Sequence, residues 1–166
     1  MVNLCVEVTT SRAIARQIIR HRSFSFQEFS QRYADATELG YPQICLRRQD
    51  TKNRQNSTED LPASVREEFS SRCYDAIDNL LELYQEMLNA GVAKECARDI
   101  LPESMPTTLY MNGTLRSWIH YIDLRAANGT QREHQNVALG AKEVFRQYFP
   151  STARAVWGEE AEAGTA

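Results

Sequence analysis

The stretch RQIIRHRSFSFQEFSQRY, residues 16–33, says most about the fold and function of this chain. Its four arginines each carry a planar guanidinium that grips phosphate or carboxylate through two parallel N–H bonds. His21 adds a ring that can donate, accept or stack, and Glu28 is the stretch's one acidic residue. This composition favours a phosphorylated, planar ligand over burial in a core.

The residues before this stretch predict a strand and a helix. Residues 2–9 alternate apolar and polar side chains, with the period of a β-strand. A cap at Thr9, Thr10 or Ser11 then begins a helix that runs to about residue 22. Its arginines recur at i, i+4 and i+8 on one side, where like charges repel and an anionic partner would relieve the repulsion. The inward face is expected to hold Ala13, Ile14, Ile18 and Ile19.

The remaining elements follow from periodicity and turn residues. Residues 23–33 predict an irregular stretch and a helical turn, and the polar run 47–64 predicts an exposed loop. Helices are expected at about 65–90, 92–99, 113–125 and 131–148, and a strand at 107–111. One domain is therefore expected over residues 1–150, followed by an acidic, disordered tail at 151–166.

The bulk composition disfavours several function classes. The net charge is −3, whereas general nucleic-acid binders are usually basic overall. Four cysteines lack metal-finger or C-x-x-C spacing, which is typical of reduced thiols, and no apolar run approaches the length of a membrane span. We therefore expect a cytoplasmic protein that binds neither nucleic acid nor membrane.

No familiar catalytic set or metal-ligand spacing occurs in the sequence, so a cofactor would have to supply any difficult chemistry. Taken singly, Arg98, His120 and Arg125 are more often structural than functional. Arg116 and Arg125 lie nine residues apart, so a straight helix would point them in opposite directions. They would then serve different ligands, or sites shared between subunits.

Three blocks of the sequence resemble the flavin-dependent thymidylate synthases. RHRSFSFQEFSQRY contains every fixed position of that family's signature, an Arg-His-Arg followed after seven residues by Ser and then x-Arg-Tyr. GVAKECARDILP and LRSWIHYIDLRAANGTQREH match two further family blocks in the same order. The resemblance covers essentially residues 2–150.

The resemblance implies a fold and a reaction. The fold would be α+β, with helices packed on a small, mainly antiparallel sheet. The enzyme would methylate dUMP reductively to dTMP, with methylenetetrahydrofolate as carbon donor, NADPH as reductant and FAD as cofactor. It would act as a homotetramer whose active sites are shared between subunits, in the cytoplasm or, for a viral protein, the host cytoplasm.

The resemblance also implies the ligand contacts. Arg125 would contact the uracil and favour its ionised form, as a permanently charged guanidinium can, while Ser30 would be a ligand contact and no nucleophile. The dUMP contacts would be Gln17, Ile18, Ile19, Arg20, Glu28, Phe29, Ser30, Gln31, Arg32, Arg98 and Arg125. The FAD contacts would be Arg20, His21, Arg22, Glu28, Thr114, Leu115, Arg116 and His120.

Family members carry further chain before the strand that opens this sequence, so we expect a domain that is incomplete at its amino terminus. The alternative function is therefore a non-catalytic remnant or fragment that binds dUMP and flavin without transferring a methyl group.

Overall fold

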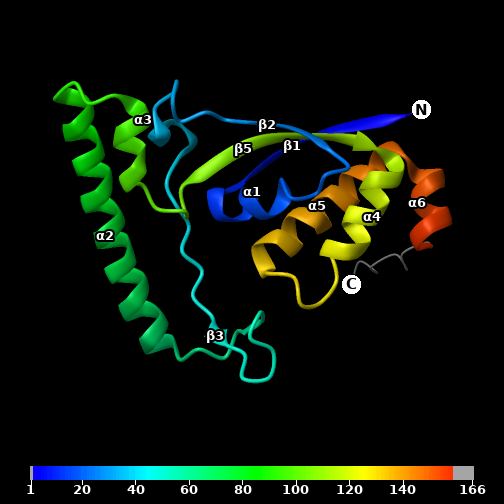
Figure 1. Cartoon of the computed structure of the whole chain (residues 1–166). Helices are drawn as coiled ribbons and strands as arrows, with labels where there is room; N and C mark the ends of the chain where they lie inside the picture. Colours follow the sequence, from blue (N-terminus) through cyan, green and yellow to red (C-terminus); the bar gives the residue numbers. More distant parts are fainter. Residues whose placement is uncertain (1, 159–166) are drawn as a thin grey trace.

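The computed structural model describes residues 2–158, which are built around a three-stranded antiparallel sheet (Figure 1). The long strand β5 (Pro106–Thr114) lies between β1 (Asn3–Ser11) and β2 (Ser25–Glu28). β1 pairs with β5 along its whole length, from Asn3 opposite Thr114 to Ser11 opposite Pro106. The α+β architecture expected from the resemblance is confirmed.

Four helices cover one face of the sheet: α1 (Arg12–Ile18), α4 (Leu115–Arg125), α5 (Arg132–Tyr148) and α6 (Pro150–Trp157). Leu109 and Met111 of β5 point into this layer and pack in one core with Trp118 and Phe145. The intervening Tyr110 is exposed on the other face. Because strand side chains alternate, one face of β5 builds the core while the other stays polar.

A second group of helices stands beside this body (Figure 1). It consists of the long α2 (Ala63–Asn89), the short α3 (Lys94–Ala97) and the 3-10 turns η1 (Ala36–Leu39) and η2 (Arg98–Ile100). Their small core contains Tyr84, whose hydroxyl accepts a hydrogen bond from the backbone N–H of Ala36 at 3.3 Å. An extended strap, residues 40–62, runs from η1 to α2 and carries the short pair β3 (Arg48–Gln49) and β4 (Ser57–Thr58). It meets the sheet body where Arg47 pairs with Glu133 of α5.

Several predicted elements need correction. The first helix ends at Ile18 instead of residue 22, which leaves Ile19 44% exposed. Residues 25–28 form a strand and not an irregular stretch, because β5 offers them a free edge from Asn112 to Leu109. The expected helix at 92–99 is divided into α3 and η2.

The predicted disordered tail is wrong for residues 151–157, which belong to α6. Pro150 occupies the first turn of this helix, where its missing N–H is not needed. Trp157 packs against Phe145 of α5 with ring centroids 5.3 Å apart and donates a hydrogen bond to Asp123. The remaining part of the predicted tail, residues 159–166, lies outside the described residues.

Candidate functional site

The end of α4 places Arg125 directly against His21, in the loop that follows α1. Arg125 Nε donates a hydrogen bond to His21 Nε2 at 2.9 Å. That nitrogen therefore accepts, which puts the ring proton on Nδ1. Burial and the nearby positive charges of Arg125 and His120 lower the pKa of His21. A neutral His21 thus orients the Arg125 guanidinium, whose terminal nitrogens make no hydrogen bond or ion pair within residues 2–158.

Behind this pair lies a buried polar network that joins α1, α4 and α5. His134 is fully buried, with Nε2 at 3.2 Å from the Tyr121 hydroxyl and Nδ1 at 3.3 Å from Gln17 Oε1. The Tyr121 ring also meets the edge of the His21 ring, at 4.9 Å between centroids. Burial, with the Arg125 charge and the neighbouring His21, lowers the pKa of His134 to about 4.

The network continues to an ion pair at the start of α5. Gln17 Nε2 donates to Gln131 Oε1 at 2.8 Å, and Gln131 Nε2 donates to Glu133 Oε2 at 3.0 Å. Arg47 of the strap grips both oxygens of Glu133, at 2.7 and 2.9 Å. Burial alone would raise the pKa of Glu133, but the hydrogen bonds from Arg47, its own backbone N–H and Gln131, with the Arg47 charge, together outweigh it, and the pKa lies below its ordinary value.

A separate polar cavity of about 220 Å³ lies between α1 and the segment around η2. Its lining includes Arg12, Arg16, Gln31 and Arg98. Arg16 pairs with Glu103 at 2.7 Å, so this cavity combines guanidinium groups with carboxylates. Such a set suits a ligand that carries both an anionic group and hydrogen-bond donors.

The loop after β2 brings the signature's second half to the same side as this cavity. Glu28 accepts a hydrogen bond from the Thr107 hydroxyl at 2.9 Å and pairs with Arg12 at 3.5 Å. Ser30 Oγ accepts from the backbone N–H of Arg32 at 3.4 Å. Arg32 makes a forked contact with Glu95 at 3.0 and 3.2 Å, which holds this loop against α3.

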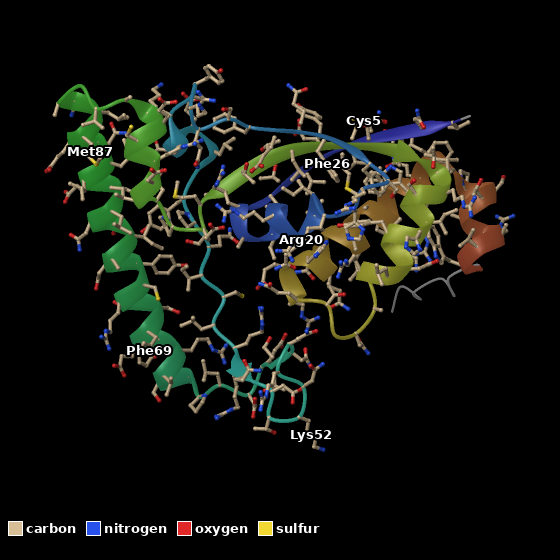
Figure 2. All side chains as sticks on the ribbon, in the orientation of Figure 1. Cys5, Arg20, Phe26, Lys52, Phe69 and Met87 are labelled. Carbon is tan, nitrogen blue, oxygen red and sulfur yellow. The ribbon has the colours of Figure 1, made fainter. Side chains whose placement is uncertain are left out.

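The first turns of α4 present a different exposed group. Arg116 and His120 are exposed and lie four residues apart, hence on one face of the helix. α4 runs unbroken from Leu115 to Arg125, so Arg116 and Arg125 point in opposite directions as the spacing predicted. Within residues 2–158, Arg20, Arg22 and Arg116 form no ion pair with a carboxylate; Figure 2 shows Arg20 just beyond the end of α1.

Some predicted contacts have side chains committed to the fold. Ile18 is fully buried in the core, so only its backbone could reach a ligand. Leu115 packs partly buried against the same core. Thr114 caps α4 by accepting from the Ser117 N–H at 3.2 Å.

The predicted dUMP residues fall into two groups within one chain. Gln17 contacts His134 in the network, and Arg125 donates to His21 beside it. Gln31 and Arg98 line the separate cavity. No hydrogen bond or ion pair joins Gln17 or Arg125 to the residues lining that cavity, within the part of the chain that the structure describes.

Sequence reasoning missed Tyr121 and His134. A signal was present, because His134 precedes Ala138, Ala141 and Phe145 on the buried face of α5. A polar residue at a core position needs hydrogen-bond partners, and that need points to a network.

Residues 2–158 bring together no group of three or more His, Cys, Asp or Glu that could hold a metal ion. The four cysteines are free. None of the helices in this described range is both long and apolar enough to cross a membrane.

Comparison with known proteins places this geometry in a family. The family model described as "Thymidylate synthase complementing protein" matches residues 1–151. The chain is 51% identical over 156 residues to the flavin-dependent thymidylate synthase of Synechocystis sp., covering 94% of this chain and 72% of that relative. The chain belongs to the flavin-dependent thymidylate synthases.

Two further matches support the assignment to this synthase family. A probable flavin-dependent thymidylate synthase of Paramecium bursaria Chlorella virus 1 is 52% identical over 153 residues, covering 92% of this chain and 70% of that protein. The fold matches the crystal structure of a UMP/dUMP methylase, PolB of Streptomyces cacaoi, bound with 5-Br UMP. That match has a TM-score of 0.79 and 27% identity, and it covers 92% of this chain and 73% of the methylase.

Proposed function

We propose that this synthase converts dUMP to dTMP by reductive methylation, with methylenetetrahydrofolate giving the carbon and NADPH the reducing equivalents. The observation that carries the proposal is the Arg125–His21 pair, in which a neutral histidine fixes a guanidinium. A guanidinium fixed in this way can stabilise negative charge that develops on a uracil ring during methylation. The crystal structure of the PolB methylase with 5-Br UMP supports a uridine nucleotide as the ligand.

The residues expected to hold FAD fit that cofactor chemically. Arg22 and Arg116 are exposed guanidinium groups without carboxylate partners in residues 2–158, and phosphate groups are their natural ligands. His120 follows on the same face of α4 as Arg116, and an imidazole there can donate to a flavin or adenine edge. When bound, FAD would supply the redox chemistry for which these side chains have no equivalent.

We further propose that the active enzyme is a homotetramer with active sites built from more than one chain. Within residues 2–158, no hydrogen bond or ion pair joins Gln17 or Arg125 to Gln31 or Arg98, although Arg16, beside Gln17, lines the cavity with Gln31 and Arg98. Assembly would allow one chain's Arg125 to face another chain's Arg98 across the same nucleotide.

The proposed reaction is tested by dTMP formation and by NADPH oxidation that depends on dUMP, in the presence of FAD and methylenetetrahydrofolate. Arg125→Ala should lower turnover by about 10²-fold or more, because it removes a charge that stabilises the transition state. Arg125→Lys keeps the charge but loses the planar fork and should recover little activity.

Arg54→Ala serves as the matched control, since Arg54 is exposed in the strap and its side chain makes no hydrogen bond or ion pair with a site residue within residues 2–158. It should leave turnover unchanged. A wild-type protein that binds dUMP and flavin but forms no dTMP would overturn the proposed reaction and favour a binding remnant. Normal turnover of Arg125→Ala would contradict the role given to that residue.

A further inference from the structure

The hydrogen-bonded chain from Glu133 through Gln131 and Gln17 to the buried His134 and Tyr121 takes its direction from one anion. Arg47 grips both oxygens of Glu133, and the pKa of Glu133 is lowered, so its carboxylate only accepts. Gln131 must therefore turn its amide Nε2 toward Glu133, at 3.0 Å. Its carbonyl oxygen then faces Gln17 and accepts from Gln17 Nε2, at 2.8 Å.

The same direction continues into the core. With Nε2 of Gln17 turned toward Gln131, its Oε1 faces His134 Nδ1 at 3.3 Å. An oxygen cannot donate there, so His134 must carry its proton on Nδ1. His134 Nε2 is then an acceptor, which the Tyr121 hydroxyl satisfies at 3.2 Å.

The two members at the buried end of this relay are held in place. His134 is 0% and Tyr121 1% exposed, so neither can turn to water for an alternative partner. The low pKa of His134 keeps its ring neutral near pH 7, as a single acceptor and a single donor require. The alternative amide orientation of Gln17 would place its carbonyl oxygen against the carbonyl oxygen of Gln131, where no hydrogen bond can form.

We infer that His134 is a positioning residue, which holds the Gln17 side-chain amide in one orientation and leaves its second N–H as a donor for the nucleotide. This inference rests on the proposed function, in which Gln17 touches dUMP. Gln17 is partly exposed, and only one of the two hydrogens on its Nε2 is used by Gln131. The ligand atom opposite Gln17 should therefore be an acceptor, such as a uracil carbonyl or a phosphate oxygen.

The first measurement is the protonation of His134 in the wild-type protein. Nitrogen NMR of the ¹⁵N-histidine-labelled chain distinguishes a protonated Nδ1 from a protonated Nε2, with assignment by loss of the signal in His134→Leu. We expect the Nδ1–H form at pH 7. The Nε2–H form would overturn the inference whether or not the protein binds dUMP.

The second measurement compares two substitutions by their dissociation constants for dUMP and by turnover. His134→Asn keeps an N–H near the Nδ1 position, so its dUMP affinity should stay within about twofold of the wild type. His134→Leu removes that donor and should weaken dUMP binding about fivefold, with KM rising more than kcat falls, as the loss of one hydrogen bond implies.

A core substitution separates positioning from simple loss of stability. Phe145 lies on the same helix and in the same core but makes no polar contact with Gln17. Phe145→Leu should therefore lower Tm without weakening the binding of dUMP. Unchanged dUMP affinity in a folded His134→Leu would overturn the inference. A wild-type protein that binds no dUMP would overturn the proposed function instead, and the tautomer would still decide the direction of the relay.

Discussion

Arg125 influences two histidines at the centre of the candidate site. It donates to His21 directly, and its charge adds to burial in lowering the pKa of both His21 and His134. The sequence made Arg125 notable only through the family resemblance, because an arginine near a helix end is common. What the sequence could not provide is the partner, since His21 and Arg125 are 104 residues apart.

The shift at His134 predicts how stability depends on pH. Its pKa falls from 6.5 in the unfolded chain to about 4 in the folded one, so between these values the unfolded state binds more protons. The free energy of unfolding is therefore unaffected by this group above pH 6.5, and it falls by up to about 3 kcal/mol as the pH falls toward 4. His21 shifts in the same direction, whereas the lowered pKa of Glu133 acts only below its ordinary value of 4.5.

Urea unfolding between pH 5 and pH 7.5 measures this effect. The wild type should lose stability as the solution is acidified, and His134→Leu should show a clearly smaller loss over the same interval. If the free energy of unfolding changed equally with pH in the two proteins, His134 would not titrate as the structure requires.

Gly113 predicts a second effect at the scale of one residue. A Cβ added there would lie 2.5 Å from the Phe24 ring, which is itself held edge-on against Trp118 at 5.0 Å between centroids. Gly113→Ala should therefore destabilise the fold by about 1–3 kcal/mol, because neither ring can withdraw without opening the core. Gly140→Ala is the control, since a Cβ at Gly140 meets nothing within 4 Å, and thermal unfolding compares the two.

At the scale of elements, periodicity predicted most of the helices but not all of the strands. α4 and α5 carry regular apolar spacing and begin within two residues of their expected positions. β2 was missed because only four residues pair, and they pair with a strand more than 80 residues away, which local pattern cannot reveal. The long α2 was predicted, and its Phe69 is 45% exposed although it is a large apolar side chain.

α6 was missed because its stabilisation comes from tertiary contacts. Trp157 meets Phe145 edge to face, lies under the Lys142 ammonium at 5.2 Å and donates to Asp123 at 2.6 Å. Trp157→Ala removes all three contacts and should lower the free energy of unfolding by about 2 kcal/mol or more. The helical circular dichroism contributed by residues 150–157 should be lost with it. Exposed Val156, one residue earlier, provides the control: Val156→Ala should leave Tm within a degree or two.

At the scale of the whole molecule, the resemblance predicted the family and the fold class, but the distribution of the site over the chain needed the structure. The sheet body carries Gln17, His21 and Arg125, while Arg98 belongs to η2, beside α3 and α2. Sequence motifs give the order of such residues but not which of them meet. No hydrogen bond or ion pair joins Gln17 or Arg125 to Arg98 within residues 2–158, and this observation makes a shared site a testable proposal.

Paired inactive variants test that proposal directly. Arg98→Ala and Arg125→Ala should each be inactive as uniform assemblies, because every site lacks one arginine. The two variants are co-expressed with different tags, and mixed assemblies are purified through both tags. If a site takes the two arginines from different chains, it is restored where Arg125 comes from an Arg98→Ala chain and Arg98 comes from an Arg125→Ala chain. Random mixing in a symmetric tetramer would restore roughly a quarter of the sites, with dTMP formation near that fraction of wild type. A mixed assembly as inactive as its parents would show that both arginines of a site come from one chain and would overturn the shared site.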